Sequence, residues 1–237
     1  MALLWSLLIV YPLIVISTVL CGSASILAAL FDKTGRSLMK VARVWARSLL
    51  RIAGVRVKVD GLEKIDPGAA YVFASNHLSY MDTPVVLGCI PVEFRFLAKK
   101  GLFRIPFLGT HLAQAGHIPV PREDPRAAVR TLAHAAEIIR EHGTSVLIFP
   151  EGGRSHDGAL RPFKDGAAYL AIKAGVPLVP ISVSGTREVL AMHSAALHRG
   201  AVRLRIGDPI PTTGLTTRDR QAVTESAREQ VARMLET

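Results

Sequence analysis

A histidine and an aspartate, separated by four residues, are the side chains of this sequence best suited to acid–base chemistry. His77 and Asp82 lie within residues 75–82, directly after an apolar run that ends at Ala74. Side chains five apart do not share a face of a regular helix, but they can meet if His77 precedes a helix whose first turn contains Asp82. Asp82 would then fix one imidazole nitrogen and leave the other as a base. The spacing of Ser79 and Asp82 also fits a simple helix cap, with His77 as an ordinary loop residue.

A second candidate site follows the apolar run 146–149. It consists of Pro150, Glu151, Gly152, Gly153, Arg154 and Ser155. Glycines let backbone N–H groups approach an anion, and arginine presents a two-pronged donor to phosphate. Taken alone, these residues fit a plain glycine turn with a surface arginine better than an anion site.

A third candidate lies in residues 98–109, where Lys99, Lys100 and Arg104 stand among apolar residues. Such a segment could hold a phosphate beside an apolar groove, or it could be a charged loop. The chain has no phosphate-binding G-x-x-x-x-G-K-[ST] motif and no G-x-S-x-G motif, which disfavours a nucleotide hydrolase and an α/β-hydrolase.

Composition excludes several further classes. The chain has 237 residues, of which 49% are hydrophobic and 20% charged, so it is not intrinsically disordered. Two cysteines, Cys21 and Cys89, cannot form a disulfide scaffold, and no Cys/His cluster has the spacing of zinc ligands. The net charge of +10 favours an acidic partner. Aromatic residues are only 6% and no nucleic-acid-binding signature occurs, so nucleic acid is not the expected partner.

The elements that must position these residues alternate along the chain. Strands are predicted over residues 55–59, 70–74, 146–149, 178–183 and 202–206, the last near a sheet edge because of its alternating arginines. A helix is predicted from Pro125, with Asp124 as its cap and Gly143 as its stop. Further helices are predicted over 165–173 and from Thr217. This order indicates an α/β fold with a mixed or largely parallel sheet flanked by helices, whose ligands bind at the carboxyl ends of strands.

The N-terminal segment has the composition of a membrane helix. Residues 1–31 carry no charged side chain and would form a helix about 46 Å long, more than the ~30 Å hydrocarbon core. A signal peptide is disfavoured because no positive region and no small-residue cleavage site is present. Pro12 and Gly22 interrupt the run, so a re-entrant helix and a spanning helix both remain open.

A basic segment follows. Residues 32–60 hold eight basic and two acidic residues, and five of the basic ones recur at helical spacing: Arg36, Lys40, Arg43, Arg47 and Arg51. This pattern predicts an amphipathic helix on an anionic membrane leaflet, or else a solvated helix face. If the first helix spans, the charge places the remainder in the cytoplasm. The predicted division is membrane helix 1–31, interfacial helix 32–58 and catalytic domain 59–237.

Four blocks taken together resemble the glycerolipid acyltransferase family typified by lysophosphatidic acid acyltransferase. They lie in the family's order over roughly residues 70–185. The blocks are Asn76-His77 to Asp82, Lys99-Lys100 through Pro106 to Gly109, Phe149 to Ser155, and Val176-Pro177 to Ile181.

The resemblance implies acyl transfer from acyl-CoA or acyl-acyl carrier protein to the sn-2 hydroxyl of lysophosphatidic acid in a bacterial-type plasma membrane. It implies no metal and no cofactor. His77 would be the base, Asp82 would orient it, Arg154 with Lys99 or Lys100 would hold phosphate, and Glu151 would order the turn. Gly152 and Gly153 would belong to the same phosphate-binding site. The remaining motif residues would support the site: Asn76, Pro106, Ser155 and Pro177.

Two positions depart from the family's usual pattern. Gly153 stands where the family usually has threonine, and Gly101 where it usually has glutamate. Both leave the acceptor open, so another lysolipid (a lyso-ornithine lipid, for example) or glycerol 3-phosphate remains an alternative. An inactive membrane lipid-binding protein is the alternative of a different class.

Overall fold

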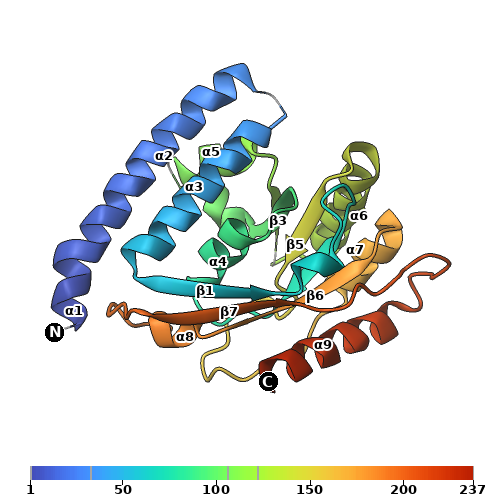
Figure 1. The fold of residues 1–237 in the computed structure, drawn as a ribbon. Coiled ribbons are helices and arrows are strands. Elements are labelled where there is room, and N and C mark those ends of the chain that lie inside the picture. The colour runs from blue at the N-terminus through green and yellow to red at the C-terminus, as the bar shows by residue number, and fades with distance from the viewer. Residues whose placement is uncertain (1, 33, 106, 122, 237) are drawn as a thin grey trace.

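The computed structural model describes residues 2–32, 34–105, 107–121 and 123–236, and its centre is a seven-stranded sheet (Figure 1). The strand order is β1-β7-β6-β2-β5-β3-β4, and every neighbouring pair is parallel except β6 and β7. The predicted mixed, largely parallel sheet is therefore confirmed. The strands are β1 Val55–Asp60, β2 Val72–Ser75, β3 Phe94–Lys99, β4 Ile118–Val120, β5 Ser145–Ile148, β6 Leu178–Ser184 and β7 Gly200–Ile206.

Helices cover both faces of this sheet (Figure 1). Helices α3 and α4 pack against one face, whereas α6, α7 and α9 pack against the other. The helices are α1 Ala2–Trp5, α2 Tyr11–Phe31, α3 Arg36–Ile52, α4 Asp82–Cys89, α5 Leu108–Gln114, α6 Pro125–His142, α7 Gly166–Ala174, α8 Thr186–Val189 and α9 Arg220–Glu236. Shorter turns of helix occur at Ser6–Val10, Leu62–Lys64 and Lys100–Arg104.

The central strand β2 shows why its sequence is a continuous apolar run. Val72 and Ala74 point into the core beneath α6, α7 and α9, while Phe73 points into the core beneath α3 and α4. Because side chains alternate across a strand and both faces are covered, every position must be apolar. Packing on both faces thereby holds the strand in place, and it fixes the point from which the following loop starts.

Several predicted element boundaries agree with the structure. The Asp124 side chain accepts a hydrogen bond from the N–H of Ala127 at 3.0 Å, and Pro125 opens α6. Gly143 ends that helix with φ of +61°. The last helix begins at Arg220 rather than Thr217, because residues 216–219 form a turn in which the Thr216 N–H donates to Asp219.

Two strands were missed by the sequence analysis, and the predicted place of a third near a sheet edge is confirmed. Strand β3 contains Arg95, which is buried and pairs with Glu93 at 2.9 Å. This charged residue interrupts the apolar pattern by which the strand could have been predicted. Strand β4 has only three residues. Strand β7 is second from the sheet edge, and its alternating arginines, Arg203 and Arg205, face Asp60 of the edge strand β1.

The N-terminal segment forms a helical hairpin with α3 (Figure 1). Residues Ala2–Phe31 are helical throughout and long and apolar enough to cross a membrane, by length and composition. Polar contacts join α2 to α3: the Ser17 and Ser48 hydroxyls lie 2.6 Å apart, and the Trp45 indole donates to the Thr18 hydroxyl at 3.0 Å. The apolar segment therefore lies along α3 and does not project away from the domain.

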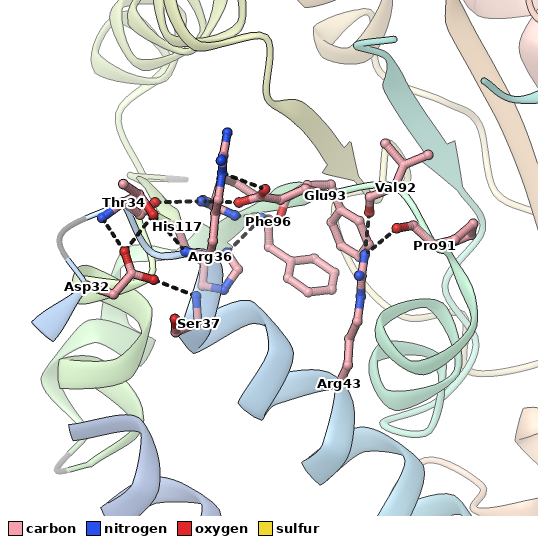
Figure 2. Close-up of polar contacts among 12 residues, drawn as sticks. Asp32, Thr34, Arg36, Ser37, Arg43, Pro91, Val92, Glu93, Phe96 and His117 are labelled. Atoms are coloured by element: carbon pink, nitrogen blue, oxygen red, sulfur yellow. Dashed lines mark hydrogen bonds and ion pairs between the residues drawn. The ribbon is translucent and has the colours of Figure 1, made fainter. Parts of the chain in front are cut away.

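The turn of this hairpin is anchored to the domain by a polar network (Figure 2). The Asp32 carboxylate accepts hydrogen bonds from the N–H groups of Thr34 and Ser37 at 2.7 and 2.6 Å. Together with the Thr34 hydroxyl, these bonds hold the pKa of Asp32 well below its usual range. Arg95 donates to the Thr34 carbonyl at 3.2 Å, which ties the turn to β3.

The predicted interfacial helix 32–58 forms as α3 over Arg36–Ile52, and its place at a membrane surface stays a prediction. Most of the apolar side of α3 is buried in the protein core, although Val44 is 61% exposed. Arg43 donates to the carbonyls of Ile90, Pro91 and Val92 at 2.6–3.1 Å, and Figure 2 shows it with Pro91 and Val92. Arg47 donates to the Gly88 carbonyl of α4 at 2.9 Å. The two guanidinium groups donate hydrogen bonds to carbonyls that the last turn of α4 and the residues just beyond it leave without helical partners. The exposed cations of the predicted stripe are Arg36, Lys40, Arg47 and Arg51.

Acidification should destabilise the fold through His117. Its Nδ1 accepts the Phe96 N–H at 2.9 Å, and burial, with smaller effects of His111 and Arg95, lowers its pKa to about 3. The unfolded chain binds this proton below about pH 6.5 and the folded chain only near pH 3. Stability should therefore fall as pH decreases through this window, by up to ~1.4 kcal/mol per pH unit.

Urea unfolding of the detergent-solubilised chain at pH 7 and pH 5 measures this loss. His117→Gln keeps an acceptor for the Phe96 N–H and should reduce the difference between the two pH values. His142→Gln, at an exposed position on α6, should not change it. The same pH dependence in both variants would contradict the assignment to His117.

Candidate active site

The site begins where the rigid strand β2 ends. Asn76 follows its last residue and pairs with Val183 of β6 through both groups of its side-chain amide. The amide donates to the Val183 carbonyl at 2.9 Å and accepts the Val183 N–H at 2.8 Å. This side chain thus replaces a backbone pairing and fixes the direction in which the loop leaves the sheet.

The structure brings the two predicted acid–base residues into contact. His77 Nδ1 lies 2.7 Å from Asp82 Oδ2, and both residues are buried. The same carboxylate oxygen accepts the N–H groups of Leu78 and Ser79 at 2.6 and 2.8 Å. Asp82 therefore orders the loop before α4 and also contacts the imidazole, so both interpretations of its spacing describe real contacts.

This contact determines which imidazole nitrogen is able to accept a proton. An ionised carboxylate can only accept hydrogen bonds, so Nδ1 of neutral His77 carries the hydrogen. The lone pair is then on Nε2, which is the nitrogen that can take up a proton. The His77 ring stacks on Phe149 at the end of β5, with centroids 3.9 Å apart and planes 14° apart. The plane of the imidazole is thereby fixed from a second strand.

Thr186 is a further member of this cluster that the sequence analysis missed. Its hydroxyl donates to Asp82 Oδ1 at 2.5 Å, and Thr186 is buried. It opens α8 immediately after Gly185, whose φ is +85°. A Cβ at Gly185 would lie 2.3 Å from the Ala201 carbonyl oxygen, so only glycine fits this close approach. The Gly-Thr pair at the end of a predicted strand was the available signal.

Glu151 joins the glycine-rich loop to the histidine loop. Its carboxylate accepts the N–H of His77 at 2.6 Å and the N–H of Arg161 at 3.1 Å. The N–H of Ser155 in turn donates to the His77 carbonyl at 2.9 Å. Burial raises the pKa of Glu151, while the two backbone donors act in the opposite direction. This carboxylate therefore holds the backbone of three segments together around His77.

Arg154 lies beside the same loop. Its guanidinium carbon is 3.9 Å from the centre of the Tyr80 ring, which places the cation over a residue three positions after His77. Gly152 has φ of +76°, and a Cβ there would lie 2.9 Å from Lys164 Nζ. Arg154 of the glycine-rich loop thus lies against the histidine loop, and Lys164 lies against Gly152.

The two predicted lysines are farther away. Lys99 and Lys100 are exposed at the end of β3, which is two strands, or ~10 Å, from β2. Lys99 Nζ lies 4.0 Å from Glu123. The structure therefore places Arg154, but not these lysines, directly against the histidine loop. Pro106 lies outside the described residues.

The remaining motif residues have structural contacts. Pro177 accepts the N–H of Val72 at 3.0 Å and so aligns β6 with β2. The Ser155 hydroxyl donates to Asp157 at 2.8 Å. Among the residues that the structure describes, no group of three or more His, Cys, Asp or Glu side chains could hold a metal ion.

Comparison with known proteins agrees with this geometry. The family model described as Acyltransferase matches residues 56–184, which include His77, Asp82, Phe149 and Glu151 and end two residues before Thr186. The chain belongs to the acyltransferase family. The family's sequence region thus coincides with the sheet edge that carries the buried His77–Asp82 pair.

Individual relatives have more specific names. The chloroplastic 1-acyl-sn-glycerol-3-phosphate acyltransferase of Brassica napus is 38% identical over 76% of this chain and 53% of its own length. The human 1-acyl-sn-glycerol-3-phosphate acyltransferase alpha is 31% identical over 81% of this chain and 68% of its own length. The chain thus spans about half the length of the plant relatives it matches.

One solved structure covers the whole acyltransferase chain. The crystal structure of the 1-acyl-sn-glycerophosphate acyltransferase PlsC from Thermotoga maritima aligns with a TM-score of 0.83 and 26% identity. It covers 100% of this chain, and 99% of that chain is covered in turn. The similarity therefore includes the N-terminal hairpin as well as the sheet.

Thr186 should position Asp82. Thr186→Val keeps the shape of the side chain but removes the hydroxyl that donates to Oδ1, so the carboxylate loses its donor from the far side. We expect kcat to fall about 10-fold or more, and KM for both substrates to change little, because the interaction bears on the base rather than on binding.

Thr186→Ser is the matched control, since it retains the hydroxyl and should recover most of the activity. A pH–rate profile distinguishes positioning from general structural damage: the valine variant should shift the acidic limb, which reports the base. A variant with an unchanged profile and activity lost only in proportion to unfolded protein would contradict the role.

Proposed function

We propose that this acyltransferase moves a fatty acyl group from a thioester donor, acyl-CoA or acyl-acyl carrier protein, to the sn-2 hydroxyl of lysophosphatidic acid, giving phosphatidic acid. The names of the relatives support this acceptor. The single observation that carries the chemistry is the buried His77–Asp82 contact of 2.7 Å. It prepares one imidazole nitrogen to act as a base.

In the proposed step, His77 Nε2 removes the proton of the acceptor hydroxyl as its oxygen attacks the thioester carbonyl carbon. The tetrahedral intermediate then collapses, the carbon–sulfur bond breaks, and the imidazolium returns the proton to the leaving thiolate. The products are an ester and a free thiol. Asp82 stabilises the imidazolium during this cycle, and the chain supplies no covalent nucleophile, metal or cofactor.

The acceptor phosphate is proposed to bind at the glycine-rich loop. Arg154 is the candidate best placed for it, because the neighbouring Ser155 is bonded to the His77 backbone. Glu151 and Gly152 would keep the loop in the required shape. Lys99 or Lys100 would complete the phosphate site if the acceptor extends toward the end of β3.

The substrate and product of this reaction are membrane lipids, so we propose that the chain attaches to the plasma membrane of a bacterial-type cell. The support is the apolar segment Ala2–Phe31, which is long enough to cross a bilayer. Large apolar side chains are exposed along its length, among them Leu8 at 72%, Leu20 at 65% and Leu30 at 69%. The catalytic domain is proposed to lie on the cytoplasmic side, where soluble acyl donors are found.

The identity of the acceptor is the finer part of this proposal. A Cβ at Gly153 would lie 3.6 Å from the Arg161 guanidinium, which is an ordinary contact, so the site has room where the family usually has threonine. Purified protein should be assayed with lysophosphatidate, lyso-ornithine lipid, other lysophospholipids and glycerol 3-phosphate, each with both donors. A clear preference for an acceptor other than lysophosphatidate would replace that part of the proposal.

Loss of the base should abolish turnover. His77→Ala should lower kcat about 10²–10⁴-fold, the usual contribution of a general base, and leave membrane association unchanged. His142→Ala, on the exposed end of α6, is the control and should be fully active. Normal activity per folded molecule in the His77 variant would show that His77 is not the base. Absence of acyl transfer by the original chain with either donor would instead favour the alternative of an inactive membrane lipid-binding protein.

Removal of the Arg154 guanidinium should weaken the binding of one substrate only, the acceptor. Arg154→Ala should raise KM for a phosphate-bearing acceptor about 10-fold or more and change KM for the donor little, because a charge-assisted bond to phosphate is lost. Arg154→Lys should rescue only partly, since lysine lacks the planar fork. Initial-rate kinetics with each substrate varied separately measure both effects, and equal effects on the two substrates would remove Arg154 from the acceptor site.

A further inference from the structure

A basic hollow lies on the β1 side of the sheet, three strands from the strand that leads to His77. It has a volume of about 550 Å³ and is lined by Arg51, Ile52, Gly54, Arg56, Arg199 and Gly200. These residues come from the end of α3, the beginning of β1 and the beginning of β7. Three guanidinium groups thus surround one cavity that no acidic residue lines.

The charges of this hollow are not balanced within the described protein. Arg51, Arg56 and Arg199 take part in no ion pair or side-chain hydrogen bond among the described residues. Farther along β7 the situation is different, because Arg203 faces Asp60. Gathering cations without a partner is unfavourable, and an anion bound among them would remove the repulsion.

The position of Arg199 is fixed by packing. Its guanidinium carbon lies 5.1 Å from the centre of the Trp5 ring. Its side chain also crosses Gly54, where a Cβ would lie 2.7 Å from the Arg199 Cγ and where φ is +68°. The cation is therefore held over the tryptophan before any ligand arrives.

The hollow also borders the apolar surface of the N-terminal helix. Trp5 lies in the first turns of that helix, and the neighbouring Leu4 and Leu8 are 59% and 72% exposed. The Leu197 N–H donates to the Ser6 hydroxyl at 2.8 Å, which fastens this end of the helix to the segment that leads into Arg199. Arginine and tryptophan beside exposed leucines are the arrangement typical of the headgroup level of a bilayer.

The topology places the hollow on the same edge of the sheet as the candidate active site. Strands β1 and β7 run opposite to β2 and β6, so they begin where β2 ends. Strand β1 is three strands from β2, a lateral distance of ~14 Å. An anion bound in the hollow and the acceptor at His77 would therefore lie at a similar level.

We propose that Arg51, Arg56 and Arg199 form a second phosphate-binding site, which holds the phosphate of a bilayer phospholipid headgroup. Guanidinium groups match phosphate oxygens through paired hydrogen bonds. The inference rests on the proposed membrane attachment and extends it: the bound lipid seats the beginning of the hairpin at the headgroup level. It thereby brings the catalytic edge of the sheet to the depth of the acceptor's phosphate.

Native mass spectrometry of the full-length chain in detergent tests this site without any measurement of acyl transfer. The chain is titrated with phosphatidylglycerol, with diacylglycerol as a lipid lacking phosphate, and with inorganic phosphate as a competitor. The site variant is R51Q/R56Q/R199Q. The matched control is R126Q/R130Q/R218Q, which removes the same charge at exposed positions elsewhere.

We expect one phosphatidylglycerol to bind the original chain and the control variant at least 10-fold more tightly than the site variant. Diacylglycerol should not distinguish the three proteins. Circular dichroism melting verifies that the variants are folded, and Arg199→Gln alone, which leaves the other two arginines, should show an intermediate loss.

Two results would overturn the inference. Equal binding of phosphatidylglycerol by all three proteins would show that the lipid binds elsewhere or only through overall charge. Displacement of the lipid by inorganic phosphate at equal concentration would assign the hollow to a soluble phosphate instead of a headgroup. Neither result bears on whether His77 catalyses acyl transfer, so failure here is separable from failure of the proposed function.

Discussion

The carboxylate of Asp82 is the group on which the candidate active site depends. A buried charge is tolerated only when hydrogen bonds replace its lost hydration. Here Oδ2 accepts from His77, Leu78 and Ser79, and Oδ1 accepts from Thr186. These donors come from the loop after β2 and from the start of α8 after β6. One side chain therefore fixes the geometry of two strand ends, and any disturbance of either end reaches the imidazole.

The sheet makes this arrangement possible. Strand β2 lies in the middle, with β6 on one side and β5 on the other. All three end at the same edge, because they are parallel. The loop after β2 supplies His77, β5 leads to Phe149 and Glu151, and β6 leads to Thr186. The cluster thus requires three neighbouring strands in register, and the double-sided apolar core beneath them supplies that register.

Sequence reasoning found the parts of the site that are local in the chain. His77 and Asp82 are close in sequence, and their contact could be inferred from the expected turn. Thr186 lies 104 residues after Asp82, and Phe149 reaches His77 from another strand. Contacts of this kind depend on strand order, which hydrophobic periodicity does not specify. The motif order suggested that these segments converge, but only the sheet shows which atoms meet.

The N-terminal region shows a second limit of periodicity. The pattern of α3 correctly indicated an apolar face and a basic face, yet it could not identify what covers each. The apolar face packs on the domain, and Arg43 satisfies carbonyls at the end of α4. A backbone carbonyl and a lipid phosphate can both be bound by cations at helical spacing, so the sequence pattern does not distinguish the two partners.

The difference has a consequence for how the hairpin could meet a bilayer. Because α3 is held by the protein, most of the apolar surface available to lipid is that of α1 and α2, where exposed leucines are concentrated. The cations that lie near the N-terminal end of the hairpin are those at the starts of β1 and β7, and not those at the middle of α3. The proposed membrane contact therefore has two parts. The lipid hydrocarbon contacts the N-terminal helix along its length, and the lipid phosphate binds at the sheet edge that also carries His77. An acceptor held in a bilayer by its acyl chain would need to move little to present its hydroxyl to that edge.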